Sequence, residues 1–172
     1  MKDTIYIDAD HAEVVCRLSS ARFKKFTSKG IASTDEFTSV SATKNGFELQ
    51  NNWMRAGNAN QFRYNKTLKR IQLIGMSRYE FGNASNDGSG ESSVNLLTGD
   101  YIGNWNYYDH LADNEQGELI KMPSIKTKMF FKITFLEDFD EATCENYSDR
   151  CSRLYEQAKV RSKKHRNDSK SD

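Results

Sequence analysis

Proline is almost absent from this chain, and no long apolar run interrupts it. A single proline, Pro123, among 172 residues argues against a Pro-rich linker or a low-complexity region. No segment approaches the roughly 20 consecutive apolar residues that a transmembrane helix needs. Asp8 also breaks the short apolar start, so no signal peptide is evident. We therefore expect a soluble cytoplasmic protein with no membrane partner, or an exported one if a leader has been removed.

Cysteine pairs and a strong net charge are missing as well. The three cysteines, Cys16, Cys144 and Cys151, are odd in number and do not form a disulfide framework. We expect reduced, buried thiols, which suit a reducing compartment. The 25 Lys and Arg residues nearly balance 24 Asp and Glu residues, for a net charge of +1. This balance gives no reason to expect a nucleic-acid partner.

Alternating apolar residues are what the chain has in quantity, and segment 125–135 shows them most clearly. One face would carry Ile125, Thr127, Met129, Phe131, Ile133 and Phe135. Successive side chains of a strand point to opposite faces, so the pattern predicts a half-buried strand of an antiparallel sheet with one wet face. We expect the side chains from Met129 to Phe135 on this face to be buried.

Shorter runs of the same kind, separated by turn residues, predict further strands. They cover residues 36–43, 47–53, 61–64, 68–81, 92–97 and 101–108. Asn45-Gly46 favours a type I′ hairpin turn, while residues 56–60 and 109–118 are expected to be connections. Two possibilities stay open for residues 10–29. Asp10 and Glu13 resemble a helix capping box, but the β-branched residues favour a strand at 13–18 followed by an irregular basic stretch.

Near the C-terminus the apolar period changes to that of a helix. Apolar residues recur three or four positions apart at Cys144, Tyr147, Cys151, Leu154 and Ala158. The spacing predicts a helix over 139–165 that covers the apolar face of the sheet, with residues 166–172 as a disordered tail. The expected fold is mainly β, an antiparallel sandwich or partly open barrel of six or more strands with one C-terminal amphipathic helix. Residues 1–165 would form a single domain.

Several hairpin motifs follow one another in a recognisable order. They are Asp35-Glu36-Phe37-Thr38-Ser39-Val40, Lys44-Asn45-Gly46, Phe62-Arg63-Tyr64, Leu73-Ile74-Gly75 and Asn95-Leu96-Leu97-Thr98-Gly99. In these motifs the chain resembles a set of bacterial β-rich proteins, many of them exported, over residues 13–108. The resemblance implies a β-hairpin fold. It implies no activity, because those proteins largely lack an assigned function.

No motif for catalysis or cofactor binding stands out. Residues 83–88 place oxygen donors at alternating positions with Gly88 sixth, as a calcium loop does, but Val94 occupies the place of the bidentate glutamate. A hairpin tip explains this segment better, and a solvated turn explains the carboxylates and imidazole of residues 8–11. We therefore predict no catalytic residue, no metal site and no cofactor, and we lean towards a protein that is not an enzyme.

Two functions fit these observations. The first is a non-enzymatic protein-binding module, such as an immunity or accessory protein that occludes its partner through complementary charge. Tyr and Trp dominate interface hot spots, so we predict a partner-binding surface made by Trp105, Tyr107, Tyr108, Asp109, Asp113 and Glu115. The alternative is a carrier of a small apolar ligand in a barrel-like cavity among Phe62, Tyr64, Ile74, Phe131 and Phe135. The sequence predicts no oligomeric state.

Overall fold

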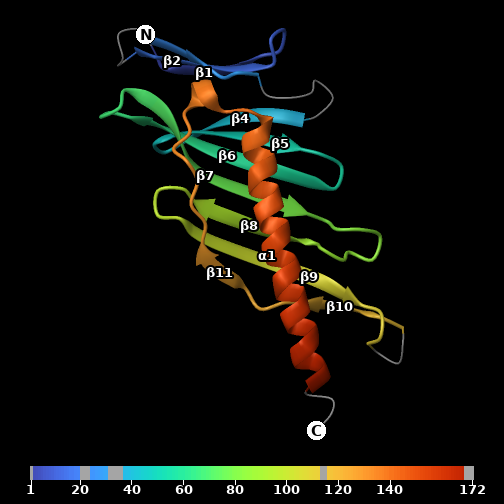
Figure 1. Ribbon diagram of the computed structural model, residues 1–172. Helices are drawn as coiled ribbons and strands as arrows, with labels where there is room; N and C mark the ends of the chain where they lie inside the picture. The colour runs from blue at the N-terminus through green and yellow to red at the C-terminus, as the bar shows by residue number, and fades with distance from the viewer. Residues whose placement is uncertain (1, 20–23, 31–36, 113–115, 169–172) are drawn as a thin grey trace.

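Two open antiparallel sheets and one long helix build the chain in its computed structural model, which describes residues 2–19, 24–30, 37–112 and 116–168 (Figure 1). The larger sheet has eight strands in the order β10-β9-β8-β7-β6-β5-β4, and β11 also pairs with β9. These strands are β4 (Phe37–Thr43), β5 (Gly46–Asn52), β6 (Ala56–Asn65), β7 (Arg70–Glu80), β8 (Gly90–Asn95), β9 (Asp100–Asp109), β10 (Glu118–Lys121) and β11 (Ile125–Lys128). The smaller sheet joins β1 (Thr4–Asp8), β2 (Glu13–Leu18) and β3 (Lys24–Thr27) in sequence order.

The helix α1 (Glu141–Asp168) crosses the strands of the larger sheet on one face, and the smaller sheet lies at the β4 end (Figure 1). Asp140 caps its start, since Oδ1 accepts hydrogen bonds from the Thr143 backbone N–H at 3.1 Å and from its hydroxyl at 2.9 Å. Tyr147, Cys151 and Ala158 are buried, whereas Asp149 is exposed. The predicted amphipathic helix is confirmed.

Alternation between the two faces of each strand creates the core beneath α1. Phe47 and Leu49 of β5 are buried between exposed or half-buried neighbours, and Val94 of β8 is buried in the same way. Phe62 of β6 stacks on Phe47 with ring centroids 5.1 Å apart and meets the Phe139 ring edge-on at 5.1 Å. The fold is therefore a mainly β, antiparallel architecture, as predicted, but its sheets remain open.

The strand predicted over 125–135 is wrong beyond its first four residues. β11 ends at Lys128, and the chain then leaves β9 and passes back over the sheet towards β7, where Phe135 bridges Gln72 (Figure 1). Met129 is buried as expected, but Ile133 is 59% exposed, and Phe131 and Phe135 are only half-buried. The chain must return to the β5–β6 side before α1 can begin, and this crossing breaks the alternation.

Other local predictions are corrected at their boundaries. Residues 56–60 form the start of β6 rather than a loop, because Ala56–Asn65 pairs along its whole length with β7. The first hairpin turns at Lys44 and Asn45, one residue earlier than predicted, and neither has the positive φ of a type I′ turn. Gly46 sits in a tight approach, since a Cβ there would lie 1.9 Å from the Phe62 carbonyl oxygen.

The ends of the chain show three further differences. Residues 13–18 form β2, which settles the open choice in favour of a strand, and the basic stretch after it includes β3. Neither β1 nor β10, which starts at the last residue of the expected connection 109–118, had a clear signal in the sequence. The helix begins two residues later than predicted and includes residues 166–168, which were assigned to the tail. The remaining tail residues, 169–172, lie outside the described ranges.

Candidate functional site

Four of the six residues predicted to bind a partner, from Trp105 to Asp109, lie in the second half of β9, near the C-terminal half of α1. Trp105 is 3% exposed and meets Tyr155 edge-on with ring centroids 6.2 Å apart, and Tyr107 is 1% exposed. Both are core side chains. Tyr108 and Asp109 are half-buried. Asp113 and Glu115 lie outside the described residues, so the predicted surface is only partly placed.

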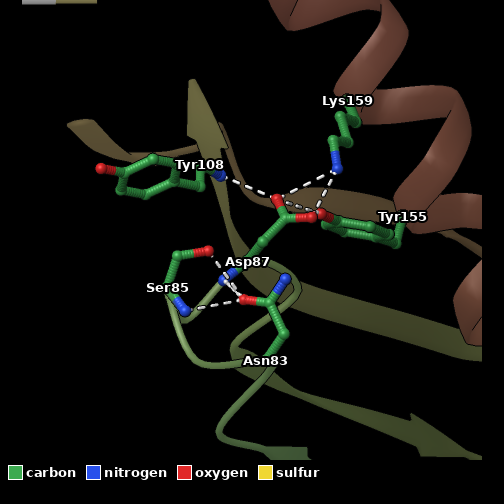
Figure 2. A network of polar contacts seen from close by, with 6 residues as sticks. All are labelled: Asn83, Ser85, Asp87, Tyr108, Tyr155 and Lys159. Carbon is green, nitrogen blue, oxygen red and sulfur yellow. Dashed lines mark hydrogen bonds and ion pairs between the residues drawn. The ribbon is translucent and has the colours of Figure 1, made fainter. Parts of the chain in front are cut away.

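The loop after β7 is held to α1 by a polar network centred on Asp87 (Figure 2). The Lys159 ammonium lies 2.8 Å from Oδ2 and 3.0 Å from Oδ1, while the Tyr155 hydroxyl and the Tyr108 backbone N–H donate to Oδ1 at 3.1 and 2.7 Å. Asn83 Oδ1 closes the loop by accepting from the Ser85 and Asp87 backbone N–H groups. The carboxylate is therefore satisfied by this protein's own donors, and residues 83–88 form a hairpin tip, as predicted.

Asp87→Asn should lower stability by about 1–2 kcal/mol at pH 7, because Lys159 loses its charged partner. Burial by itself would raise the pKa of Asp87, but hydrogen bonds from Lys159 and Tyr108 outweigh it and hold that pKa below its ordinary 3.8. A lowered pKa gives stability that is present above about 3.8 and is lost as the pH falls through the folded-state value. Urea titrations at pH 7 and pH 3 should therefore show the difference between variant and wild type shrinking at pH 3.

The dependence of stability on pH in the alkaline range tests the same Asp87–Lys159 ion pair from the side of the lysine. Burial by itself would lower the pKa of Lys159, but hydrogen bonds to Asp87 and Tyr155 raise it above its ordinary 10.5. Its contribution to stability is complete below pH 10.5 and disappears as the pH rises through the raised pKa of the folded state.

The control for Asp87→Asn is Asp149→Asn on the exposed side of α1, which should change the stability little. An Asp87→Asn deficit equal at pH 3 and pH 7 would contradict the ion-pair account.

A partly open, mainly apolar pocket of about 230 Å³ lies between the N-terminal half of α1 and strands β5, β6 and β7. We call it the sub-helix pocket. Its apolar and aromatic lining comprises Trp53, Met76, Tyr79, Phe139, Cys144 and Tyr147. Its charged lining comprises Arg78, Glu80, Asp140, Glu141 and Glu145.

Next to this pocket, large apolar side chains reach the surface. Met54 is 93% exposed, Phe81 is 53% exposed and Trp53 is 39% exposed. Trp53 and Met54 lie in the β5–β6 turn, and Phe81 follows β7. Their backbones are side by side, since the Phe81 N–H donates to the Arg55 carbonyl at 2.8 Å. We call these three exposed residues of two neighbouring turns the edge patch, and Trp53 also lines the pocket.

The charged residues that line the sub-helix pocket carry more negative than positive charge. Arg78 forms an ion pair with Glu80, donates to the Ser148 carbonyl at 3.1 Å, and its Cζ lies 5.7 Å from the Trp105 ring centroid. No ion pair from the described part of the chain reaches Asp140, Glu141 or Glu145. Three carboxylates around an apolar opening therefore lack an ion-pair partner, and one of them, Asp140, is the helix cap.

The Cys144 thiol lies in the wall of the pocket, close to these carboxylates. Burial is the main cause that raises its pKa to about 12, and the charges of Glu141, Asp140 and Glu145 add to the shift, against a hydrogen bond to Asn60 that lowers it. The thiol is accordingly protonated at neutral pH and a poor nucleophile. The negative charge of the neighbouring carboxylates disfavours a further anion in the pocket.

Sequence reasoning missed the sub-helix pocket and the edge patch. Trp53 was placed at the end of a strand and Phe81 at the end of another, while the turn was expected at residues 56–60. The available signal was a pair of large apolar residues, Trp53-Met54, next to a predicted turn, where polar residues are usual. The pocket had no signal, because its walls come from segments about 90 residues apart.

Comparison with known proteins adds no relative: no family model matches the chain, and neither a curated protein nor a solved structure does. Within the described ranges, no group of three or more His, Cys, Asp or Glu side chains is arranged to hold a metal ion. Among the same residues, no helix has both the length and the apolar content needed to cross a membrane.

Proposed function

We propose that the chain is a non-enzymatic protein-binding module that uses the edge patch and the sub-helix pocket to occlude a partner, as an immunity or accessory protein would. The observation that supports it is that three exposed large apolar residues lie on two neighbouring turns, one of which borders a pocket. Trp and Met are enriched in protein interfaces and Trp is prominent in hot spots, usually where an apolar centre is surrounded by a polar rim. Here the rim is acidic.

The arrangement of the patch supports binding by rigid contact rather than by folding on contact. Trp53 is fixed by its backbone N–H, which donates to the Ala56 carbonyl at 2.7 Å. The Arg55 guanidinium donates to the carbonyls of Phe81, Gly82 and Asn83 and ties the turn to the end of β7. A surface that is already ordered loses less conformational entropy when it binds.

The surface predicted around Tyr108 and Asp109 stays a second proposal for the same function. It has less support, because the two aromatic residues expected to lead it, Trp105 and Tyr107, are packed in the core. A reducing compartment such as the cytoplasm is the proposed location, which three unpaired cysteines support.

Replacing both Trp53 and Met54 with Ser should weaken partner binding by about 30-fold or more, the effect of losing roughly 2 kcal/mol at a hot spot. The experiment is quantitative co-purification from native lysate, followed by titration of the partner that is retained. Leu97→Ser with Ile102→Ser is the matched control, since both side chains are exposed apolar residues at other places on the sheet. The proposal is refuted if both double variants recover the same amount of partner protein, or if the wild type recovers no specific protein.

The alternative proposal, a carrier of a small apolar ligand, has weaker support. The sheets are open, and the sub-helix pocket of about 230 Å³ is smaller than the roughly 300–1,000 Å³ of typical ligand sites. Phe62, which the carrier hypothesis placed around the ligand, packs instead against Phe47 and Phe139. Saturable binding of a fatty acid that quenches Trp53 fluorescence would favour the carrier over the protein-binding module.

A further inference from the structure

We propose that the sub-helix pocket receives a lysine or arginine side chain of the partner protein, with the aliphatic stem among the aromatic residues and the cationic head at the acidic rim. This inference rests on the proposed function and adds the chemistry of the contact. A pocket of about 230 Å³ with a mainly apolar lining favours an occupant with an apolar part over a fully hydrated ion. Long basic side chains are the residues that bury an apolar stem and keep a charged end near polar groups.

The charge of the lining selects the sign of the occupant. Four carboxylates face one guanidinium, for a formal charge of −3, and that guanidinium is already occupied by Glu80, the Ser148 carbonyl and the Trp105 ring. Glu141 and Glu145 are one helical turn apart and exposed, so both can turn towards the opening. A cation on the partner is the complement of this rim.

The start of α1 opposes a cation, but more weakly. The positive end of a helix dipole is equivalent to about half an elementary charge, and the Asp140 carboxylate already lies on it as the cap. Two further carboxylates, Glu141 and Glu145, remain beyond that compensation. The aromatic rings of Trp53 and Tyr79 in the lining add attraction for a cation, since a ring face is electron-rich.

Nuclear magnetic resonance titration of the complete, ¹⁵N-labelled chain tests this inference without the partner. The first probe is n-butylammonium, which copies the end of a lysine side chain, and 1-pentanol is its uncharged counterpart. We expect n-butylammonium to shift the Trp53 indole and the Cys144 and Ser148 amide signals in a saturable way, with at least fivefold higher affinity than 1-pentanol. Equal affinities, or shifts only elsewhere, would overturn the assignment.

Charge variants separate the rim from the general acidity of the protein. Glu141→Gln with Glu145→Gln should weaken n-butylammonium binding by about five- to tenfold, in line with roughly 0.5 kcal/mol or more per exposed pair. Asp10→Asn with Glu156→Gln changes the net charge equally at exposed positions that do not line the pocket and should leave the affinity unchanged. Equal losses in both double variants would mean unspecific attraction and would overturn the inference.

A second variant fills the pocket and leaves its charges in place. Cys144→Phe should abolish the n-butylammonium shifts while the circular dichroism spectrum stays that of the wild type. If that variant does not fold, Ser148→Leu at the same wall serves instead. Retained binding in a folded, filled variant would refute the pocket as the site.

A peptide probe separates a partner protein from a free amine. Acetyl-Leu-Lys-Leu-amide should bind more tightly than n-butylammonium, because its flanking residues can contact the edge patch. Equal affinity would assign the pocket to a small free amine and overturn the partner assignment. Peptide binding without any captured protein would refute the proposed function alone. If the captured partner binds the Glu141→Gln, Glu145→Gln double variant as tightly as the wild type, this inference alone is refuted.

Discussion

Cys151→Asp is expected to detach α1 from the sheet. The Cys151 side chain is fully buried, and its Sγ lies 3.4 Å from the Ser92 hydroxyl, beside Tyr147. Burial raises the pKa of the neighbouring Tyr101 to about 12, which shows how poorly this site supports a negative charge. An unpaired carboxylate here should cost about 4 kcal/mol or more, against a total stability of roughly 5–15 kcal/mol for a domain of this size.

The measurements are urea unfolding and hydrogen exchange of the amides in α1. The variant should lose protection along the helix before the strands of the larger sheet lose theirs. Its deficit should shrink at low pH, because burial raises the pKa of the new carboxyl and protonation removes the charge. Ser152→Asp, one residue away on the exposed side of α1, should change stability by less than about 0.5 kcal/mol. A similar loss in both variants would show that docking of α1 is not what the substitution breaks.

Phe62→Ala is expected to destabilise the protein by about 3–5 kcal/mol, because the ring leaves a cavity that its neighbours fill only in part. Phe62 is fully buried and is the point where β5, β6 and the start of α1 meet, through Phe47 and Phe139. The urea midpoint should fall while the slope of the transition stays constant, since the folded state still buries most of its surface.

Phe81→Ala is the matched control for that substitution. Phe81 is 53% exposed at the end of β7, so the same loss of a ring should cost less than about 1 kcal/mol. The two variants also separate stability from function, because Phe81 belongs to the edge patch and Phe62 does not. A stability loss of equal size at both positions would contradict the location of the core.

The fold was predictable because its strands and its helix follow from residue patterns within short segments of the chain. Burial alternates along β5 and β9 because their side chains point alternately to α1 and to solvent, and that alternation is written in the sequence. The stripe from Cys144 to Ala158 is equally local, since one helical turn brings its members together. Where a chain leaves a sheet is not local: Met129 to Phe135 continue the alternation although the ladder between β11 and β9 ends at Lys128.

The candidate site was less predictable than the fold. Aromatic residues near Asp109 were expected on the surface, but a composition rule cannot distinguish Trp105, under the helix, from Trp53, at the edge. Their exposures differ because Trp105 packs against Tyr155 of α1, whereas Trp53 lies in the β5–β6 turn at a partly open pocket. The length and direction of the helix axis relative to the strands decide this, and neither appears in any one segment.

The sequence by itself determined an antiparallel, mainly β fold with one C-terminal helix packed on a half-apolar sheet, because both periods arise within short segments. Only the tertiary structure decided that the sheets stay open, that β11 is short, and that the turn carrying Trp53 and Met54 lies beside the end of β7 and next to the carboxylates of the pocket. These features depend on contacts between residues far apart in the chain. Such contacts are set by the balance of packing over the whole molecule, and no local pattern encodes them.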